Sequence, residues 1–260
     1  MEKTLLLSFL LPIFLRFSET TSASGPGATF TFKNNCHQTI WPATLSGNGL
    51  SVVAGGGFEL APNASASFWA PPSWSGRFWA RTRCLFGDPS SASGSCATGD
   101  CAGALSCAVS GAAPATLAEF TLGGKDDFYD VSLVDGYNVG IGVRPSAAPT
   151  AERRCWYAGC VADVKARCPA ELRVAAPGGE TVACRSACEA FGAPEYCCSG
   201  AHATPETCGP TRYSQLFKAA CPAAYSYAYD DATSTFTCPA GTSDYLITFC
   251  PSPEGGQSQS

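Results

Sequence analysis

Sixteen cysteines, all between Cys36 and Cys250, constrain this chain of 260 residues more than any other feature. Their number is even, and no Cys-x-x-Cys pair of the kind used for zinc binding or dithiol redox chemistry occurs in the sequence. Such a dense, even set is typical of secreted proteins whose fold is held by disulfide bonds. The sequence therefore predicts up to eight disulfides, with no metal site and no cofactor.

The N-terminal residues have the parts of a secretory signal peptide. Lys3 precedes an apolar stretch over residues 5–15, small residues follow over 20–24, and we expect cleavage after Ser24. The apolar stretch is shorter than the roughly 20 residues that a membrane-spanning helix needs, and no second such stretch follows. The sequence therefore predicts a signal peptide over residues 1–24, a secreted protein without a transmembrane segment or lipid anchor, and a flexible C-terminal tail over 252–260.

The net charge of the chain limits which partners it can bind, and its composition limits the fold class. The formal net charge of −5 argues against nucleic acid as a binding partner and against non-specific attraction to anionic membranes. With 27 glycines, 19 prolines and 14% charged residues, the chain favours short strands and many turns over long helices. We expect a monomer.

The sequence Asn63-Ala64-Ser65 is an acceptor site for N-glycosylation at Asn63. The alternative is a chance match to the acceptor pattern that is never occupied.

Hydrophobic patterning divides the chain into two kinds of region. Apolar and polar residues alternate in six segments, which predicts the strands of an antiparallel sandwich or barrel: residues 29–33, 67–70, 77–82, 116–122, 128–134 and 245–249. Between Cys155 and Cys221 lie nine of the cysteines and the clearest helical pattern, in which Thr211 caps a helix that ends at Pro222. This region is predicted to be a small, disulfide-rich satellite.

The residues alone limit the disulfide pairing without solving it, since sixteen cysteines allow about two million connectivities. The adjacent residues Cys197 and Cys198 are expected to have different partners, because a bridge between neighbours is strained. A bond between the first and last cysteines would enclose more than 200 residues and contribute roughly 5 kcal/mol by loop entropy, as an upper estimate.

The segment from Cys96 to Cys107, Cys-x-Thr-Gly-Asp-Cys-x-Gly-x-x-x-Cys, resembles the signature of thaumatin-like proteins, the plant pathogenesis-related group that includes osmotin and zeamatin. The resemblance extends over the chain from about Ala28. Ala92 stands where the signature usually has glycine, and Ala223 where the family commonly has aspartate. Other segments resemble family landmarks in family order: residues 34–36, 79–82, 116–120, 130–136, 195–198, 224–227 and 249–251.

The resemblance implies a mainly β fold over residues 28–251. Its antiparallel sandwich would use residues 28–81, 113–161 and 222–251, with a small loop domain over 82–112 and a helical, disulfide-rich satellite over 162–221. The family also implies eight disulfide pairs and no free thiol: Cys36–Cys250, Cys84–Cys96, Cys101–Cys107, Cys155–Cys238, Cys160–Cys221, Cys168–Cys184, Cys188–Cys197 and Cys198–Cys208.

By the same resemblance, a cleft between the sandwich and the satellite carries one arginine and four carboxylates, which match Arg77, Glu119, Asp130, Asp135 and Asp230. Clustered carboxylates raise one another's pKa, so one can stay protonated while another is ionised, as glycoside hydrolysis requires. We hypothesise Glu119 as general acid and Asp135 as base or nucleophile, with Asp130 and Asp230 bonding sugar hydroxyls. Three aromatic residues are candidates either for stacking on sugars or for the core: Phe128, Tyr129 and Tyr225.

The resemblance implies an extracellular, apoplastic protein with an antifungal role, which recognises β-1,3-glucan or another fungal cell-wall polysaccharide in this cleft. We place binding without efficient turnover ahead of hydrolysis. One alternative is a weak endo-β-1,3-glucanase acting through Glu119 and Asp135. Another is an inhibitor of a secreted enzyme or a membrane-perturbing protein, with a purely structural cleft. A Ser-His-Asp triad would need His37 or His202, and both are expected at the surface.

Overall fold

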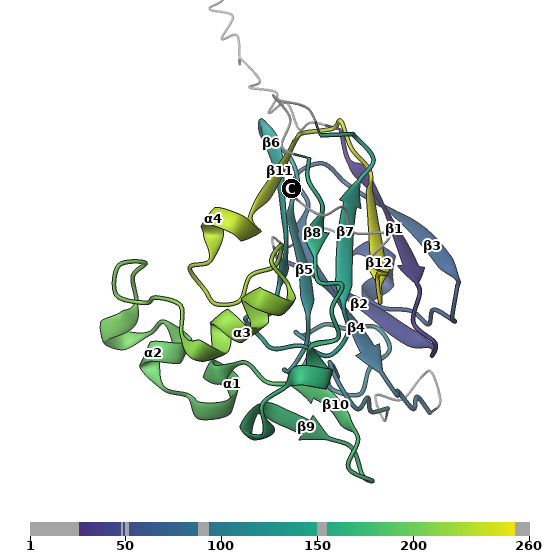
Figure 1. Ribbon diagram of the computed structural model, residues 1–260. Helices are drawn as coiled ribbons and strands as arrows, with labels where there is room; N and C mark the ends of the chain where they lie inside the picture. The colour runs from purple at the N-terminus through teal and green to yellow at the C-terminus, as the bar shows by residue number, and fades with distance from the viewer. Residues whose placement is uncertain (1–25, 48, 50–51, 88–93, 150–154, 253–260) are drawn as a thin grey trace, which may run out of the picture.

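A computed structural model describes residues 26–47, 49, 52–87, 94–149 and 155–252. The expected signal peptide, and the expected tail beyond residue 252, lie outside the described residues. Two five-stranded sheets form a sandwich, with a region of short helices beside it (Figure 1). The predicted mainly β sandwich is therefore confirmed.

The first sheet has the strand order β3-β1-β12-β7-β8. Neighbouring strands are antiparallel except β1 and β12, which come from opposite ends of the chain and run parallel. The bounds are Ala28–Asn34 for β1, Ser65–Ala70 for β3, Ile141–Pro145 for β7, Ala158–Gly159 for β8 and Tyr245–Phe249 for β12.

The second sheet has the order β11-β6-β5-β4-β2 and is antiparallel throughout. The bounds are Ile40–Ser46 for β2, Ser75–Thr82 for β4, Leu117–Thr121 for β5, Asp126–Ser132 for β6 and Phe236–Pro239 for β11. The six segments predicted from alternation are confirmed as β1, β3, β4, β5, β6 and β12. The other strands were not predicted.

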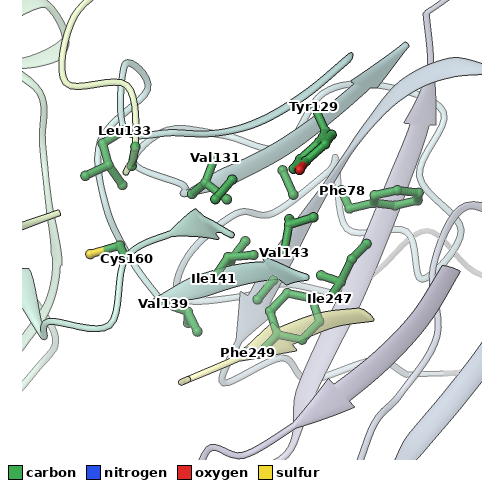
Figure 2. Packing of buried hydrophobic residues seen from close by; sticks show 14 of the residues in the cluster. Phe78, Tyr129, Val131, Leu133, Val139, Ile141, Val143, Cys160, Ile247 and Phe249 are labelled. Carbon is green, nitrogen blue, oxygen red and sulfur yellow. The ribbon is translucent and has the colours of Figure 1, made fainter. Parts of the chain in front are cut away.

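The core lies between the sheets and is rich in aromatic rings. The ring centroid of Phe30 on β1 lies 4.9 Å from that of Phe78 on β4 and 4.7 Å from that of Phe120 on β5. Figure 2 shows Tyr129 and Val131 on the same side of this core as Phe78, facing residues such as Ile247 of the other sheet. Because side chains alternate along a strand, the intervening residues of β4, β5 and β6 point away from this core.

The helical region lies beside the second sheet (Figure 1). The predicted helix is confirmed as α3, Arg212–Ala220, and begins with a capping box in which Thr211 and Ser214 each bond the other's backbone N–H. A short turn segment, η1 (Val53–Gly56), in which Ala54 and Gly55 have positive φ, lies between β2 and β3. The remaining elements are η2 (Val164–Arg167), η3 (Ala170–Leu172), β9 (Arg173–Ala175), β10 (Thr181–Cys184), α1 (Ala187–Phe191), α2 (Pro194–Cys197), η4 (Gly200–His202) and α4 (Asp231–Ser234).

All sixteen cysteines lie in the described residues and form eight disulfides. Cys36–Cys250 joins the ends of the paired strands β1 and β12 and encloses a sequence separation of 214. The pairs are those that the family resemblance implies: Cys36–Cys250, Cys84–Cys96, Cys101–Cys107, Cys155–Cys238, Cys160–Cys221, Cys168–Cys184, Cys188–Cys197 and Cys198–Cys208.

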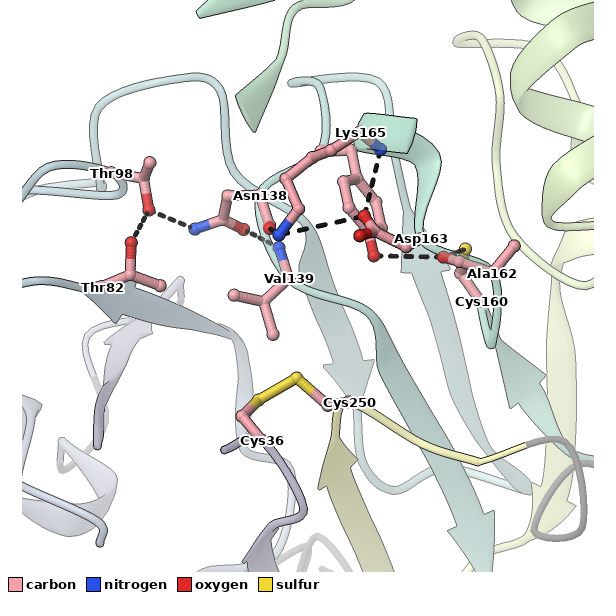
Figure 3. Close-up of polar contacts among 11 residues, drawn as sticks. Cys36, Thr82, Thr98, Asn138, Val139, Cys160, Ala162, Asp163, Lys165 and Cys250 are labelled. Atoms are coloured by element: carbon pink, nitrogen blue, oxygen red, sulfur yellow. Dashed lines mark hydrogen bonds and ion pairs between the residues drawn. A yellow bond between two sulfur atoms is a disulfide. The ribbon is translucent and has the colours of Figure 1, made fainter. Parts of the chain in front are cut away.

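Asn138 is a buried polar side chain that joins separate segments near the end of the sandwich (Figure 3). Its Nδ2 donates hydrogen bonds to the carbonyl oxygen of Ala80 (2.8 Å) and to Oγ1 of Thr98 (2.9 Å). Its Oδ1 accepts from the backbone N–H groups of Thr116 (3.1 Å) and Val139 (2.8 Å). One amide therefore holds β4, the segment after Cys96 and the approach to β5 in a fixed arrangement.

Replacing Asn138 by alanine is expected to lower the free energy of unfolding by about 3 kcal/mol, because buried partners on several segments would lose their hydrogen bonds. Denaturant unfolding of the purified protein measures this change. Gln215→Ala removes an exposed amide on α3 and serves as the control, with an expected change within about 0.5 kcal/mol. A loss for Asn138→Ala no larger than that of the control would contradict the role assigned to this amide.

Candidate functional site

A row of charged side chains crosses three strands on the outer face of the second sheet. In the strand register, Arg77 of β4 pairs with Glu119 of β5, and Glu119 pairs with Asp130 of β6. Their sequence neighbours Phe78 and Phe120 face the core, so the three charged side chains share the opposite face. Residues that are distant in sequence are thus neighbours because of the strand pairing.

This row forms the floor of a cleft of about 370 Å³. The volume lies within the range of small-molecule and cofactor sites. Asp135, in the turn after β6, is exposed at the cleft, while Glu119 and Asp130 are half-buried. The segment between α3 and the start of α4 supplies the other wall. The lining residues are Arg77, Leu117, Glu119, Asp130, Ser132, Val134, Asp135, Tyr225, Ala228 and Asp231.

Four of the five expected residues line the cleft; the fifth, Asp230, does not, and its neighbour Asp231 lines it instead. The carboxylate of Asp230 accepts hydrogen bonds from the backbone N–H (3.0 Å) and hydroxyl (2.9 Å) of Ser226. It also forms an ion pair of 3.0 Å with Lys218 of α3. Asp230 therefore closes a turn and anchors it to the helix, which leaves the next residue to face the cleft.

Lys218 holds the wall that carries Asp231. Its Nζ also donates to the carbonyl oxygen of Ala224 (3.1 Å) and to Oγ of Ser234 (2.8 Å), so it spans the segment from one end to the other. Within this segment the hydroxyl of Tyr225 donates to Oδ1 of Asp231 (2.7 Å). Sequence reasoning missed both Lys218 and Asp231, although Asp231 directly follows the expected residue Asp230 in the sequence.

The electrostatics of the cleft favour a protonated carboxyl group. Burial, together with the nearby charges of Glu119 and Asp231, raises the pKa of Asp130 to about 8, and burial is the largest of these causes. Oδ1 of Asp130 is buried and has no hydrogen-bond partner among the described residues. Burial also raises the pKa of Glu119; Arg77 opposes this rise and Asp135 adds to it. At neutral pH the cleft therefore holds a carboxylic acid that can donate a hydrogen bond.

The three aromatic residues considered for stacking on sugars differ in their exposure. Tyr129 is 1% exposed and packs against Phe120 and Tyr245, so it belongs to the hydrophobic core. Tyr225 lines the cleft, and Phe128 on β6 is 48% exposed.

The other singled-out residues lie elsewhere. His37 is exposed, as expected, whereas His202 is half-buried, with Nδ1 2.8 Å from the carbonyl oxygen of Thr207. Neither histidine lines the cleft. Asn63 is exposed in the turn before β3.

Within the part of the chain that the structure describes, no helix is both long and apolar enough to cross a membrane. In the same residues, no group of three or more His, Cys, Asp or Glu side chains is arranged to hold a metal ion.

Comparison with known proteins gives matches over most of the chain. A sequence model described as the Thaumatin family matches residues 34–251. A pathogenesis-related thaumatin-like protein 3.5 of Cryptomeria japonica is 58% identical over 228 residues, which cover 87% of this chain and 91% of that protein. A Prunus avium protein named glucan endo-1,3-beta-glucosidase is 52% identical over 230 residues, which cover 86% of this chain and 91% of that protein. Among solved structures, a thaumatin-like xylanase inhibitor matches with a TM-score of 0.46 and 24% identity, covering 85% of this chain and 99% of the other.

Proposed function

The chain belongs to the thaumatin family, and on this premise we propose that it is a secreted, pathogenesis-related defence protein with an antifungal role, which binds β-1,3-glucan in the acidic cleft. The observation that carries the proposal is the row of Arg77, Glu119 and Asp130 on the floor of an open cleft. The name of the Prunus avium relative supports the choice of polysaccharide.

The chemistry of the row suits a neutral, hydroxyl-rich ligand. Sugar hydroxyls both donate and accept hydrogen bonds, so they can donate to carboxyl oxygens such as those of Asp135 and accept from the Arg77 guanidinium. Protonated Asp130 adds a second kind of donor, because burial raises its pKa to about 8. A cleft that offers both donors and acceptors can bind several hydroxyls of one sugar in a defined orientation.

Secretion is part of the proposal. Eight disulfides are typical of proteins that fold in an oxidising compartment, and the apoplast is such an environment. The exposed position of Asn63 before β3 is compatible with glycosylation on the secretory route.

Hydrolysis of the bound glucan is a second candidate, favoured by the raised pKa of Glu119. A carboxyl group that stays protonated can give its proton to the glycosidic oxygen as the bond to the anomeric carbon breaks. Asp135 would then act as the base that activates water, or as the nucleophile that attacks the anomeric carbon. Hydrolysis would take place in the same cleft as binding, and it predicts that the protein releases new reducing ends from the glucan.

The test combines binding with turnover on a soluble β-1,3-glucan, measured by calorimetry and by reducing-end release. We expect the mature protein to bind, and Glu119→Gln and Asp135→Asn each to weaken binding about tenfold, because each replaces a carboxyl group that bonds the ligand. Glu189→Gln, at an exposed position on α1, is the matched control and should bind like the parent.

The outcomes separate the candidates. Reducing-end release by the parent that is lost in both cleft variants, with glucan still bound, would establish the hydrolase. Binding without release in every protein supports recognition alone. If the parent does not bind, the glucan proposal is wrong, and a partner enzyme or a membrane becomes the target to examine.

A further inference from the structure

The acidic cleft continues along the sheet into a second hollow of about 190 Å³. Arg77, Glu119 and Asp130 line both spaces, so the charged row separates two parts of one groove. The second hollow is lined in addition by Gly47, Ser75, Gly76, Phe120, Thr121 and Phe128.

The strand register explains this continuity. Ser75 pairs with Thr121, and Thr121 pairs with Phe128, which forms a row two residues along from the charged row and on the same face of the sheet. On the other side of the charged row, Leu117 pairs with Ser132. Two residues of a strand span about 7 Å, so these three rows extend over about 14 Å. A groove of this length is longer than one sugar ring.

The chemistry changes along the groove. Among the residues that the structure describes, the second hollow adds no ionisable side chain to the three shared with the cleft. It contributes the hydroxyls of Ser75 and Thr121, whose oxygens lie 3.2 Å apart. Beside them stands the phenyl ring of Phe128, which is 48% exposed. An apolar ring next to a few polar groups is the usual composition of a small-molecule site. It suits a sugar, which has an apolar C–H face and hydroxyls at its edge.

We propose that the second hollow is a sugar subsite, in which Phe128 packs against the face of a sugar ring and the hydroxyls of Thr121 and Ser75 bond its edge. The groove then takes a linear, neutral polysaccharide, with two sugars in the acidic cleft, over the charged row and the neighbouring Leu117–Ser132 row, and a further sugar over Phe128. This inference rests on the proposed function, since it assumes that the acidic cleft binds glucan.

The experiment compares ligands of different length. Calorimetry with a β-1,3-linked glucose disaccharide and with the corresponding hexasaccharide is carried out on the parent, Phe128→Ala and Phe128→Tyr. Phe128→Ala is expected to lower the affinity for the hexasaccharide about tenfold, the effect of losing one buried aromatic contact, and to leave the disaccharide affinity unchanged. Phe128→Tyr keeps the ring and should retain the parent's affinity for both.

Phe191→Ala is the matched control, because Phe191 on α1 is 43% exposed and does not line the groove. Thermal unfolding of each variant checks that the fold is kept. Equal weakening of both ligands by Phe128→Ala, or no weakening of the hexasaccharide, would overturn the second subsite while leaving the proposed function in place. If the parent binds neither ligand, the proposed function fails and the subsite fails with it.

Discussion

Replacing Cys36 and Cys250 together by alanine is expected to lower the free energy of unfolding by about 5 kcal/mol, according to the loop-entropy relation. This disulfide encloses a sequence separation of 214, the longest of the eight. Without it, the unfolded chain can separate its ends, while the folded protein still pairs β1 with β12. The loss therefore arises mainly in the unfolded state. Guanidinium unfolding under non-reducing conditions measures it.

A short-range disulfide provides the control for this prediction. Cys188–Cys197 spans a separation of 9, and the same relation gives about 2.6 kcal/mol for its removal. Both double variants remove two sulfur atoms, so the difference between them isolates the effect of loop length. If the Cys188/Cys197 variant loses as much stability as the Cys36/Cys250 variant, entropy of the unfolded chain does not explain the role of the long-range bond.

Strands were predictable where one face of the strand meets the core and the other faces outward. β1 and β6 have this alternation, and the burial pattern of their residues follows it. β7 was missed because most of its residues are buried on both faces, which removes the alternation. β2 was missed because Pro42 interrupts it; the strand lies at the edge of its sheet, where a missing N–H group is tolerated.

The candidate site was predictable from the sequence only through family resemblance. Alternation tells which residues of one strand share a face, but it does not tell which residue of the next strand lies opposite. The alignment of Glu119 with Arg77 and Asp130 depends on the register, which turn geometry and packing decide. The choice between Asp230 and Asp231 depends on Lys218, which lies on a separate helix. Non-local contacts of this kind leave no local pattern in the sequence.

The stability of Asp130→Asn relative to the parent should depend on pH. The pKa of Asp130 is about 8 in the folded protein, whereas an aspartate in an unfolded chain has a pKa near 4. Between these values the folded state keeps a proton that the unfolded state has released, so the free energy of unfolding of the parent falls as pH rises from about 4 to about 8. Asparagine has a similar shape and does not ionise.

We therefore expect the two proteins to have similar stability near pH 4 and Asp130→Asn to be more stable near pH 8. The pKa values differ by about four units and one pKa unit corresponds to about 1.4 kcal/mol, so the expected gain near pH 8 is on the order of 5 kcal/mol. Denaturant unfolding at several pH values measures it, with Glu59→Gln as a control that removes an exposed carboxylate. A difference between parent and Asp130→Asn that does not change with pH would mean that Asp130 ionises in the folded protein without penalty.

The same measurement in a Glu119→Gln background tests the cause of the raised pKa. Burial is the largest cause, and the charge of Glu119 is the next. Removing that charge should lower the pKa of Asp130, so the gain from Asp130→Asn near pH 8 should be smaller in this background than in the parent. An unchanged gain would mean that the charge of Glu119 does not contribute, and would leave burial and Asp231 as the causes of the raised pKa. A smaller gain would show that the two carboxyl groups, paired across β5 and β6, titrate as a coupled pair.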